Sequence, residues 1–143
     1  MIAALTPDRL FEIASSFVLI GWLALLVAPL RRRLWVAVAR WVAVILSGGY
    51  LTLLVAGLAG AGPPAGAGFG TLEGVRLLLS SPQALLAGWV HYLAFDLFVA
   101  SWQVEDAPAA RVPHWLLVPC LALTFVAGPV GLLLYFIVKA ARR

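Results

Sequence analysis

The strongest constraint on this chain is a series of long apolar runs without charged side chains. The first, Ile13–Leu30, holds 18 residues with no Asp, Glu, Lys or Arg, and further apolar runs follow it within the 143 residues. A helix that crosses the hydrocarbon core of a bilayer needs about 20 such residues. The chain is 64% hydrophobic and 11% charged, against about 45–50% and about 25% in soluble domains. The soluble and disordered classes are therefore excluded.

The basic residues lie beside the apolar runs rather than on a separate basic face. The formal net charge is +4, and the clusters at 31–33 and 139–143 both flank apolar runs. Cations at such positions contact lipid headgroups at the membrane surface. We therefore expect the lipid bilayer as their partner, and no nucleic acid. The single cysteine, Cys120, cannot form an intramolecular disulfide.

The fold class that follows is all-α, an integral membrane four-helix bundle with a short interfacial helix before the third span. Thr6-Pro7 and Ser81-Pro82 each combine a capping side chain with a proline suited to the first helical turn. A stretch rich in glycine and proline cannot hold a helix and predicts a flexible loop. We expect one transmembrane domain over 1–143, with spans at about 9–30, 34–59, 83–103 and 114–139, the loop at 57–70 and the interfacial helix at 71–80.

Four crossings would place both ends of the chain on one side of the membrane. Counted in that way, five Lys and Arg residues lie on each side, so the positive-inside rule gives no orientation. Gly128-Pro129 interrupts the last span and predicts a kink, because proline cannot donate the helical hydrogen bond to the carbonyl of Phe125. At membrane depth that carbonyl must face protein, water or a ligand.

Two ionisable residues, His91 and Asp96, fall near the middle of the third span. A charge at the bilayer centre costs about 2.5–3.5 kcal/mol on insertion scales, so such residues are functional candidates. Five residues correspond to about 140° around a helix, so we expect the two side chains on different faces. A structural alternative is that Asp96 bonds Tyr92 or Thr124 to fix helix packing.

Tyr92 and Trp89 precede Asp96 by four and seven residues and share its helix face. Gln103, seven residues after Asp96, is expected to extend this polar face to the membrane surface. The face therefore combines a carboxyl group with two aromatic side chains that carry a polar tip.

Two further polar residues are candidates. Thr124 lies near the Gly128-Pro129 break, and Glu12 lies one turn into the first span, where the helix dipole also accounts for an acid. No His-x-x-x-His or Glu-x-x-His spacing occurs, so no metal site is predicted, and a carboxylate-rich site is left open.

Three segments resemble one known family. The run GWVHYLAFDLFV at 88–99, followed by Trp102 and Asp106, resembles the central motif of the abscisic-acid-deficient-four-like family. The run AGPVGLL at 127–133 is similar to that family's last-span motif, and LFEIASS at 10–16 is similar to its first span. The resemblance covers nearly the whole chain except the glycine-rich loop.

Plant members of this family are plastid membrane proteins associated with neoxanthin synthesis, in which a xanthophyll epoxide becomes an allenic alcohol. The resemblance implies a membrane-embedded isomerase of a carotenoid or apocarotenoid that needs no cofactor. One proton must reach the epoxide oxygen and another must leave a neighbouring carbon, which assigns acid and base roles to Asp96 and His91. Burial in hydrocarbon favours the uncharged form of both groups, as those roles require. The substrate contacts expected with them are Trp89, Tyr92, Trp102, Thr124, Phe125 and Glu12.

Other functions stay open beside the isomerase. The same residues would anchor a carotenoid or quinone in a non-catalytic binding protein, and a metal-dependent carotenoid-modifying enzyme or a small transporter is a further alternative. In each case the expected partner is a lipophilic small molecule, and a homo-oligomer is left open. The alanine-rich composition without a transit peptide leads us to expect a multi-pass protein of a bacterial inner membrane.

Overall fold

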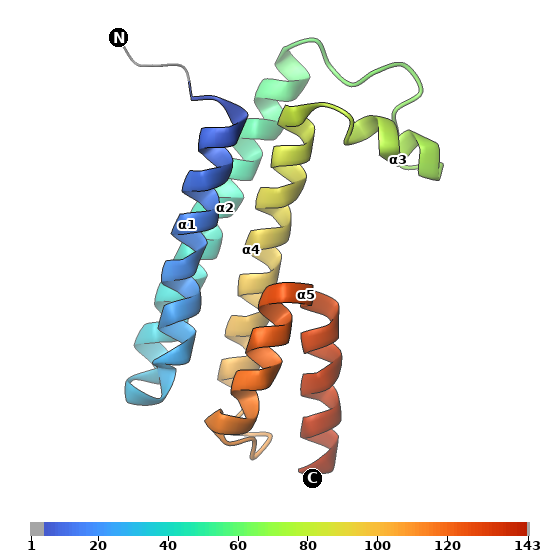
Figure 1. Cartoon of the computed structure of the whole chain (residues 1–143). Coiled ribbons are helices and arrows are strands. Elements are labelled where there is room, and N and C mark those ends of the chain that lie inside the picture. Colours follow the sequence, from blue (N-terminus) through green and yellow to red (C-terminus); the bar gives the residue numbers. More distant parts are fainter. Residues whose placement is uncertain (1–4, 143) are drawn as a thin grey trace.

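The structure, a computed structural model, describes residues 5–142, and the regular elements in that range are all helices. Four of them are long and apolar enough to cross a membrane, so the chain is a multi-pass membrane protein. The predicted all-α bundle, with a short helix before the third long one, is confirmed (Figure 1). The elements are α1 (Pro7–Leu26), the 3-10 helix η1 (Ala28–Leu30), α2 (Arg32–Ala59), α3 (Leu72–Leu78), α4 (Pro82–Asp106) and α5 (His114–Ala141).

Side-chain caps set three of the helix starts, those of α1, α3 and α4. The hydroxyl of Thr6 accepts from the backbone N–H of Arg9 at 3.4 Å, and Pro7 occupies the first turn of α1. Ser81 caps α4 in the same way, with the N–H of Ala84 at 3.2 Å. Each cap satisfies an N–H group that has no partner within its own helix.

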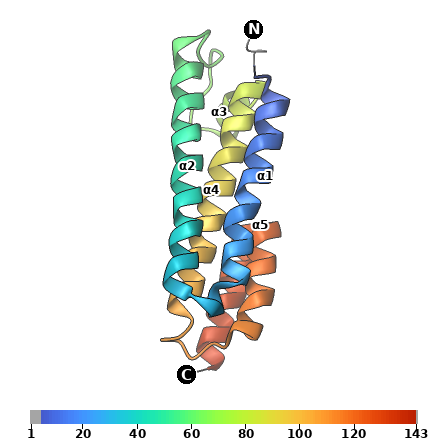
Figure 2. The same cartoon turned by 90° about the vertical axis from the view of Figure 1, so that its left-hand side faces the viewer.

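Helix α4 packs against α1, α2 and α5 and forms the centre of the bundle (Figures 1 and 2). Small residues allow the close approach of α1, since a Cβ added at Gly21 would collide with the side chain of Leu97. Leu97 itself is fully buried. Between membrane helices, such small-residue contacts replace the hydrophobic driving force that acts in water.

Helix α5 folds back on itself. Ala127 has non-helical angles (φ −149°, ψ 65°), directly before Gly128-Pro129, and the helix reverses there about halfway along α4 (Figure 1). The two arms touch, because a Cβ added at Gly131 would overlap the backbone and hydroxyl of Thr124. The predicted break is therefore present, but it is a hairpin rather than a kink.

Contacts at the far end of α5 confirm the reversal. The ammonium group of Lys139 donates to a carboxylate oxygen of Asp106 at 2.5 Å, and Nε of Arg142 donates to the carbonyl of Arg111 at 3.3 Å. A straight helix would carry Lys139 about 37 Å beyond His114. The returning arm instead ends beside the point where α5 begins.

This hairpin corrects the expected topology. We call the end formed by η1, the segment 107–113 and the last turn of α5 the basic end, and the opposite end, with the start of α1 and with α3, the loop end (Figures 1 and 2). Pro7 and Ala141 therefore lie at opposite ends rather than at the same one.

The distribution of charge changes with the topology. Of the nine described Lys and Arg residues, two lie at the loop end, Arg9 and Arg76. The basic end holds the other seven, which are Arg31, Arg32, Arg33, Arg40, Arg111, Lys139 and Arg142. The positive-inside rule therefore favours a cytoplasmic position for the basic end.

Candidate functional site

The site forms where the bend of α5 meets the middle of α4. The carboxyl group of Asp96 lies against Gly128, because a Cβ added to that glycine would overlap the carboxylate atoms. Its Oδ2 atom is buried and has no hydrogen-bond partner among the described residues, and the nearest polar group to the carboxyl is the Tyr92 hydroxyl, as the structural alternative expects. A buried acceptor without a partner is costly, so this atom marks a place where a ligand hydrogen bond would be favourable.

Tyr92 connects α4 to the bend. It lies one helical turn before Asp96 on the same face, and its hydroxyl donates to the carbonyl of Val126 at 3.2 Å. That carbonyl belongs to the last turn of the first arm of α5, where the break at Ala127 interrupts the helix. The sequence predicted that Pro129 would leave the carbonyl of Phe125 without a helical partner. The carbonyl that a side chain binds is instead the next one, that of Val126.

An aromatic stack leads from the loop end to this point. The Trp89 ring stacks on Tyr92, with centroids 5.4 Å apart and an interplanar angle of 26°. Phe11 of α1 packs on the same indole at 5.4 Å, and the indole N–H donates to the hydroxyl of Ser15 at 3.0 Å. These rings form a continuous stack from α1 across α4 to the bend, which Tyr92 reaches through its bond to Val126.

His91 lies elsewhere. Its ring stacks on Phe95 at 4.6 Å and packs edge-on against Tyr50 of α2 at 5.5 Å. The two ionisable residues of α4 are thus on different faces, as the helical spacing predicts. The structure does not bring His91 to the bend where Asp96 lies.

Thr124 has a structural partner instead of Asp96. Its buried hydroxyl accepts from Nε2 of Gln103 at 3.1 Å and donates to the carbonyl of Cys120 at 2.8 Å. Gln103 is fully buried, so the expectation that it extends the polar face to the membrane surface is wrong. This pair fixes the first arm of α5 to α4.

The remaining predicted contacts are spread along the bundle. Phe125 packs edge-on against Trp22 of α1 at 5.2 Å, close to the bend. Trp102 lies nearer the basic end, against Tyr135 of the returning arm at 5.6 Å and under the ammonium group of Lys139 at 5.7 Å. Glu12 is exposed, and among the described residues it has no hydrogen-bond or ion-pair partner.

The residues that sequence reasoning missed act mainly through the backbone. Gly128 provides the space for the Asp96 carboxyl group, and the Val126 carbonyl provides the acceptor for Tyr92. The sequence signal for both was the Gly-Pro pair, which predicted a break without saying what would pack against it. Ser15 carried no signal beyond a polar residue in an apolar run.

Metal ligands are not gathered at this site. Within residues 5–142, no group of three His, Cys, Asp or Glu side chains has an arrangement that would hold a metal ion. A protein metal site usually needs three or four such ligands.

Comparison with known families gives one finding that bears on this site. A family model described as ABA4-like (ABA DEFICIENT 4-like) matches residues 9–135. The match spans Trp89, Tyr92 and Asp96 as well as the bend of α5. No curated protein matches the chain, and no solved structure does.

Proposed function

The chain belongs to the ABA4-like family, and from this premise we propose that it is a membrane-embedded enzyme that isomerises a carotenoid or apocarotenoid. The observation that carries the proposal is the buried, unpartnered Oδ2 of Asp96 at the bend of α5. Intramembrane ionisable groups are rarely retained without a partner or a task. Asp96 is the group best placed to perform acid–base chemistry on a lipophilic ligand.

The reaction conserves every atom of the substrate. In an epoxide-to-allene isomerisation, the Asp96 carboxylic acid gives its proton to the epoxide oxygen as the C–O bond opens. A proton on a neighbouring carbon then leaves to the Asp96 carboxylate, and the electron pair of that C–H bond forms the new double bond. The acid is regenerated, and the balance needs no oxidant or reductant. General acid–base catalysis of this kind contributes typically 10²–10⁴-fold.

The surrounding side chains suit a conjugated substrate. The stack of Trp89 on Tyr92 offers flat, polarisable surface on which a polyene packs. The bond from Tyr92 to the bend holds the tyrosine ring and the turn of α5 in one arrangement. We assign Tyr92 a positioning role, since its hydroxyl is already engaged.

His91 takes a different part in the proposal. It lies about 7.5 Å from Asp96 along the axis of α4, on a face where it packs against Phe95 and against Tyr50 of α2. A base for the reaction at Asp96 would have to lie closer, so we assign both proton transfers to Asp96. His91 is proposed instead to contact a distant part of a long polyene.

The main test is expression in a carotenoid-producing bacterium, followed by chromatography of the pigments. We expect a new isomer of unchanged mass with the native chain and a loss of at least 100-fold in its formation with D96N. Y92F should lose about fivefold, because one neutral hydrogen bond contributes about 1 kcal/mol. D8N, which changes an exposed acid at the start of α1, is the matched control and should keep full activity.

The outcomes separate the alternatives. Full activity of D96N would refute the role of Asp96, and a strong loss in H91A alone would return the base to His91. Unchanged pigment bound to the purified chain without product would establish a non-catalytic binding protein. Loss of turnover on treatment with a chelator, reversed by added metal, would establish the metal-dependent alternative.

We propose a bacterial inner membrane as the location. The charge distribution of the described residues then places the basic end in the cytoplasm. The bend of α5 lies near the middle of the bilayer, where a lipophilic substrate arrives laterally from the hydrocarbon. A homo-oligomer is not needed for this site, because α1, α4 and α5 of one chain supply all the residues named.

A further inference from the structure

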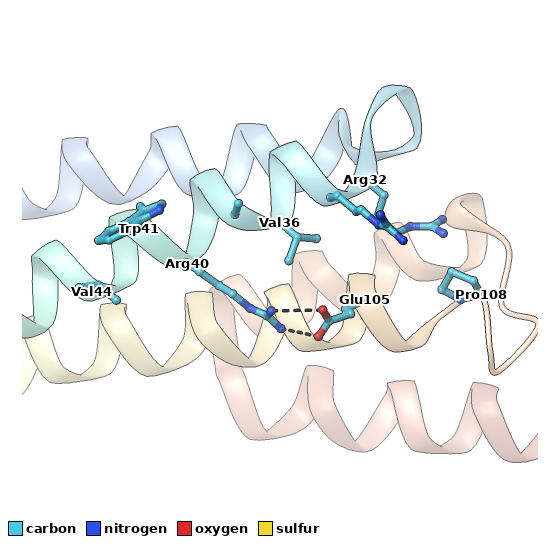
Figure 3. A pocket seen from close by; sticks show the side chains of 9 residues that line it. Arg32, Val36, Arg40, Trp41, Val44, Glu105 and Pro108 are labelled. Atoms are coloured by element: carbon cyan, nitrogen blue, oxygen red, sulfur yellow. Dashed lines mark hydrogen bonds and ion pairs between the residues drawn. The ribbon is translucent and has the colours of Figure 1, made fainter.

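A second site lies at the basic end, separate from Asp96. A groove of about 560 Å³ runs along the outer face of α2 beside the last turn of α4 (Figure 3). Its lining combines charge and apolar surface. The residues are Arg32, Arg33, Val36, Ala37, Arg40, Trp41, Val44, Glu105 and Pro108.

The lining is ordered along the helix. The two arginines lie in the first turn of α2 at the end of the bundle, and Trp41 and Val44 lie two to three turns further in (Figure 3). From Arg32 to Val44 the helix rises about 18 Å, which is close to the roughly 15 Å of hydrocarbon in one leaflet. The groove therefore presents cations at the membrane surface and an apolar stripe that extends into the leaflet.

The two outer arginines are free to bind a ligand. Arg32 and Arg33 are exposed, and neither has a hydrogen-bond or ion-pair partner within the described part of the chain. The other cations at this end differ. Lys139 is paired with Asp106, and Arg142 donates to a backbone carbonyl.

The one acid of the groove is already neutralised. Arg40 forms a two-point ion pair with Glu105, with N–O distances of 3.2 and 2.5 Å, and its Nε also donates to Ser101 at 3.3 Å. Figure 3 shows Arg40 reaching from α2 to Glu105 of α4 among the residues that line the groove. Because Arg40 compensates Glu105, the net charge that faces a ligand comes from Arg32 and Arg33.

We infer that this groove binds an anionic phospholipid, with the phosphate between Arg32 and Arg33 and an acyl chain along Ala37, Trp41 and Val44. Arginine matches phosphate geometry with paired N–H donors. Basic pockets between membrane helices on the cytoplasmic side are a recurring form of anionic lipid site. The exposed indole of Trp41, 67% accessible, offers a flat apolar surface to an acyl chain within the leaflet. A free phosphate ion would use the arginines but would gain nothing from the apolar stripe.

The test uses the full chain in detergent, titrated with phosphatidylglycerol or phosphatidylcholine, with bound lipid counted by native mass spectrometry. We expect phosphatidylglycerol to bind more tightly. A basic residue near an anionic surface contributes a factor of about five, so R32Q/R33Q should weaken this binding about 25-fold. W41A should also weaken it, through the lost contact with the acyl chain.

The matched control removes two charges from the same end outside the groove. R31Q/R111Q should change the affinity no more than about threefold, and thermal unfolding should show that every variant is folded. Three results would overturn the proposal: equal losses in the two double variants, equal binding of the two lipids, or displacement of the lipid by millimolar inorganic phosphate. The first would indicate diffuse electrostatic attraction only, and the last a site for a soluble anion.

Discussion

The two halves of α4 differ in what covers them. In the half toward the basic end, Leu97, Ala100 and Gln103 are fully buried between α1, α2 and the hairpin of α5. In the half toward the loop end, Leu85 is 61% and Trp89 37% exposed. The bend of α5 reaches only about halfway along α4, so α5 does not cover this half (Figure 1). Asp96 lies at the boundary between the covered and the uncovered half.

This difference separates two tasks along one helix. The covered half is held by polar bonds that cross between elements, including Lys139 to Asp106 and Gln103 to Thr124. The uncovered half carries aromatic rings and few such bonds. A site for a lipophilic ligand requires both a rigid support and an accessible aromatic surface. The covered half of α4 supplies the support, and the uncovered half supplies the surface.

The largest effect we predict concerns the sidedness of the chain. Single cysteines at Ala61, Ala109 and Ala141 would be exposed, whereas Cys120 is buried. With α5 as a hairpin, a membrane-impermeant maleimide should label A109C and A141C from one side and A61C only from the other. The native chain with Cys120 alone should stay unlabelled. Labelling of A141C from the same side as A61C would mean that α5 crosses the membrane.

The stability of the fold should depend most on the close contact between the two arms of the α5 hairpin. In G131A the new methyl group overlaps Thr124, so we expect the free energy of unfolding in detergent to fall by about 3 kcal/mol. G57A in α2 has open space around it and should gain up to about 1 kcal/mol from helix propensity. Thermal unfolding followed by circular dichroism compares the two. Equal stability of both variants would contradict the close approach of the arms.

The ionic contact of the covered half should contribute less. Asp106 accepts from both Tyr135 and Lys139, and their side chains are largely buried, so D106N should cost about 2 kcal/mol. The pair of Glu105 with Arg40 is more exposed, at 56% for the glutamate side chain, and E105Q should cost about 0.5 kcal/mol. A larger loss for E105Q than for D106N in the same unfolding assay would reverse this order.

The smallest effect should come from the loop end. The Arg76 guanidinium beside Glu73 lowers the pKa of that carboxyl group. A lowered pKa means that the stabilisation is complete above the ordinary glutamate value and is lost as the pH falls through the lowered one. Both side chains are exposed and α3 lies apart from the core, so E73Q should leave the unfolding temperature of the bundle unchanged from neutral pH down to pH 5. A shift in that temperature would show that α3 is coupled to the bundle.

The number and approximate positions of the helices were predictable from the sequence. Charge-free runs set the number of long helices, and Thr6-Pro7 and Ser81-Pro82 set two of their starts. The reversal of α5 was not predictable, because two apolar arms of about half the length have the same hydropathy as one continuous span. The angle at Gly128-Pro129 depends on contacts made far away in the sequence, such as that of Lys139 with Asp106.

The part of the candidate site on α4 was predictable, and the part contributed by another helix was not. Asp96 was identified because a carboxyl group amid apolar residues is expensive, and its shared face with Tyr92 and Trp89 follows from helical spacing alone. Its partner surface could not be identified, since it is a backbone turn at Gly128 from another helix. His91 carried the same signal as Asp96, yet it packs on Tyr50 of α2 instead. The sequence pattern locates a residue along its helix but not the neighbour that its side chain will meet.

The half-length hairpin also bears on how the chain enters the membrane during synthesis. The hairpin of α5 begins and ends at the basic end, so Lys139 and Arg142 never need to pass through the hydrocarbon. With the basic end in the cytoplasm, as proposed above, Arg9 and Arg76 are the only described cations that must be carried to the far side, and Arg76 travels with Glu73 as its counter-ion. Moving a single charge through the bilayer centre costs several kcal/mol. The re-entrant arm therefore lets the most basic part of the chain stay on the side on which it is synthesised.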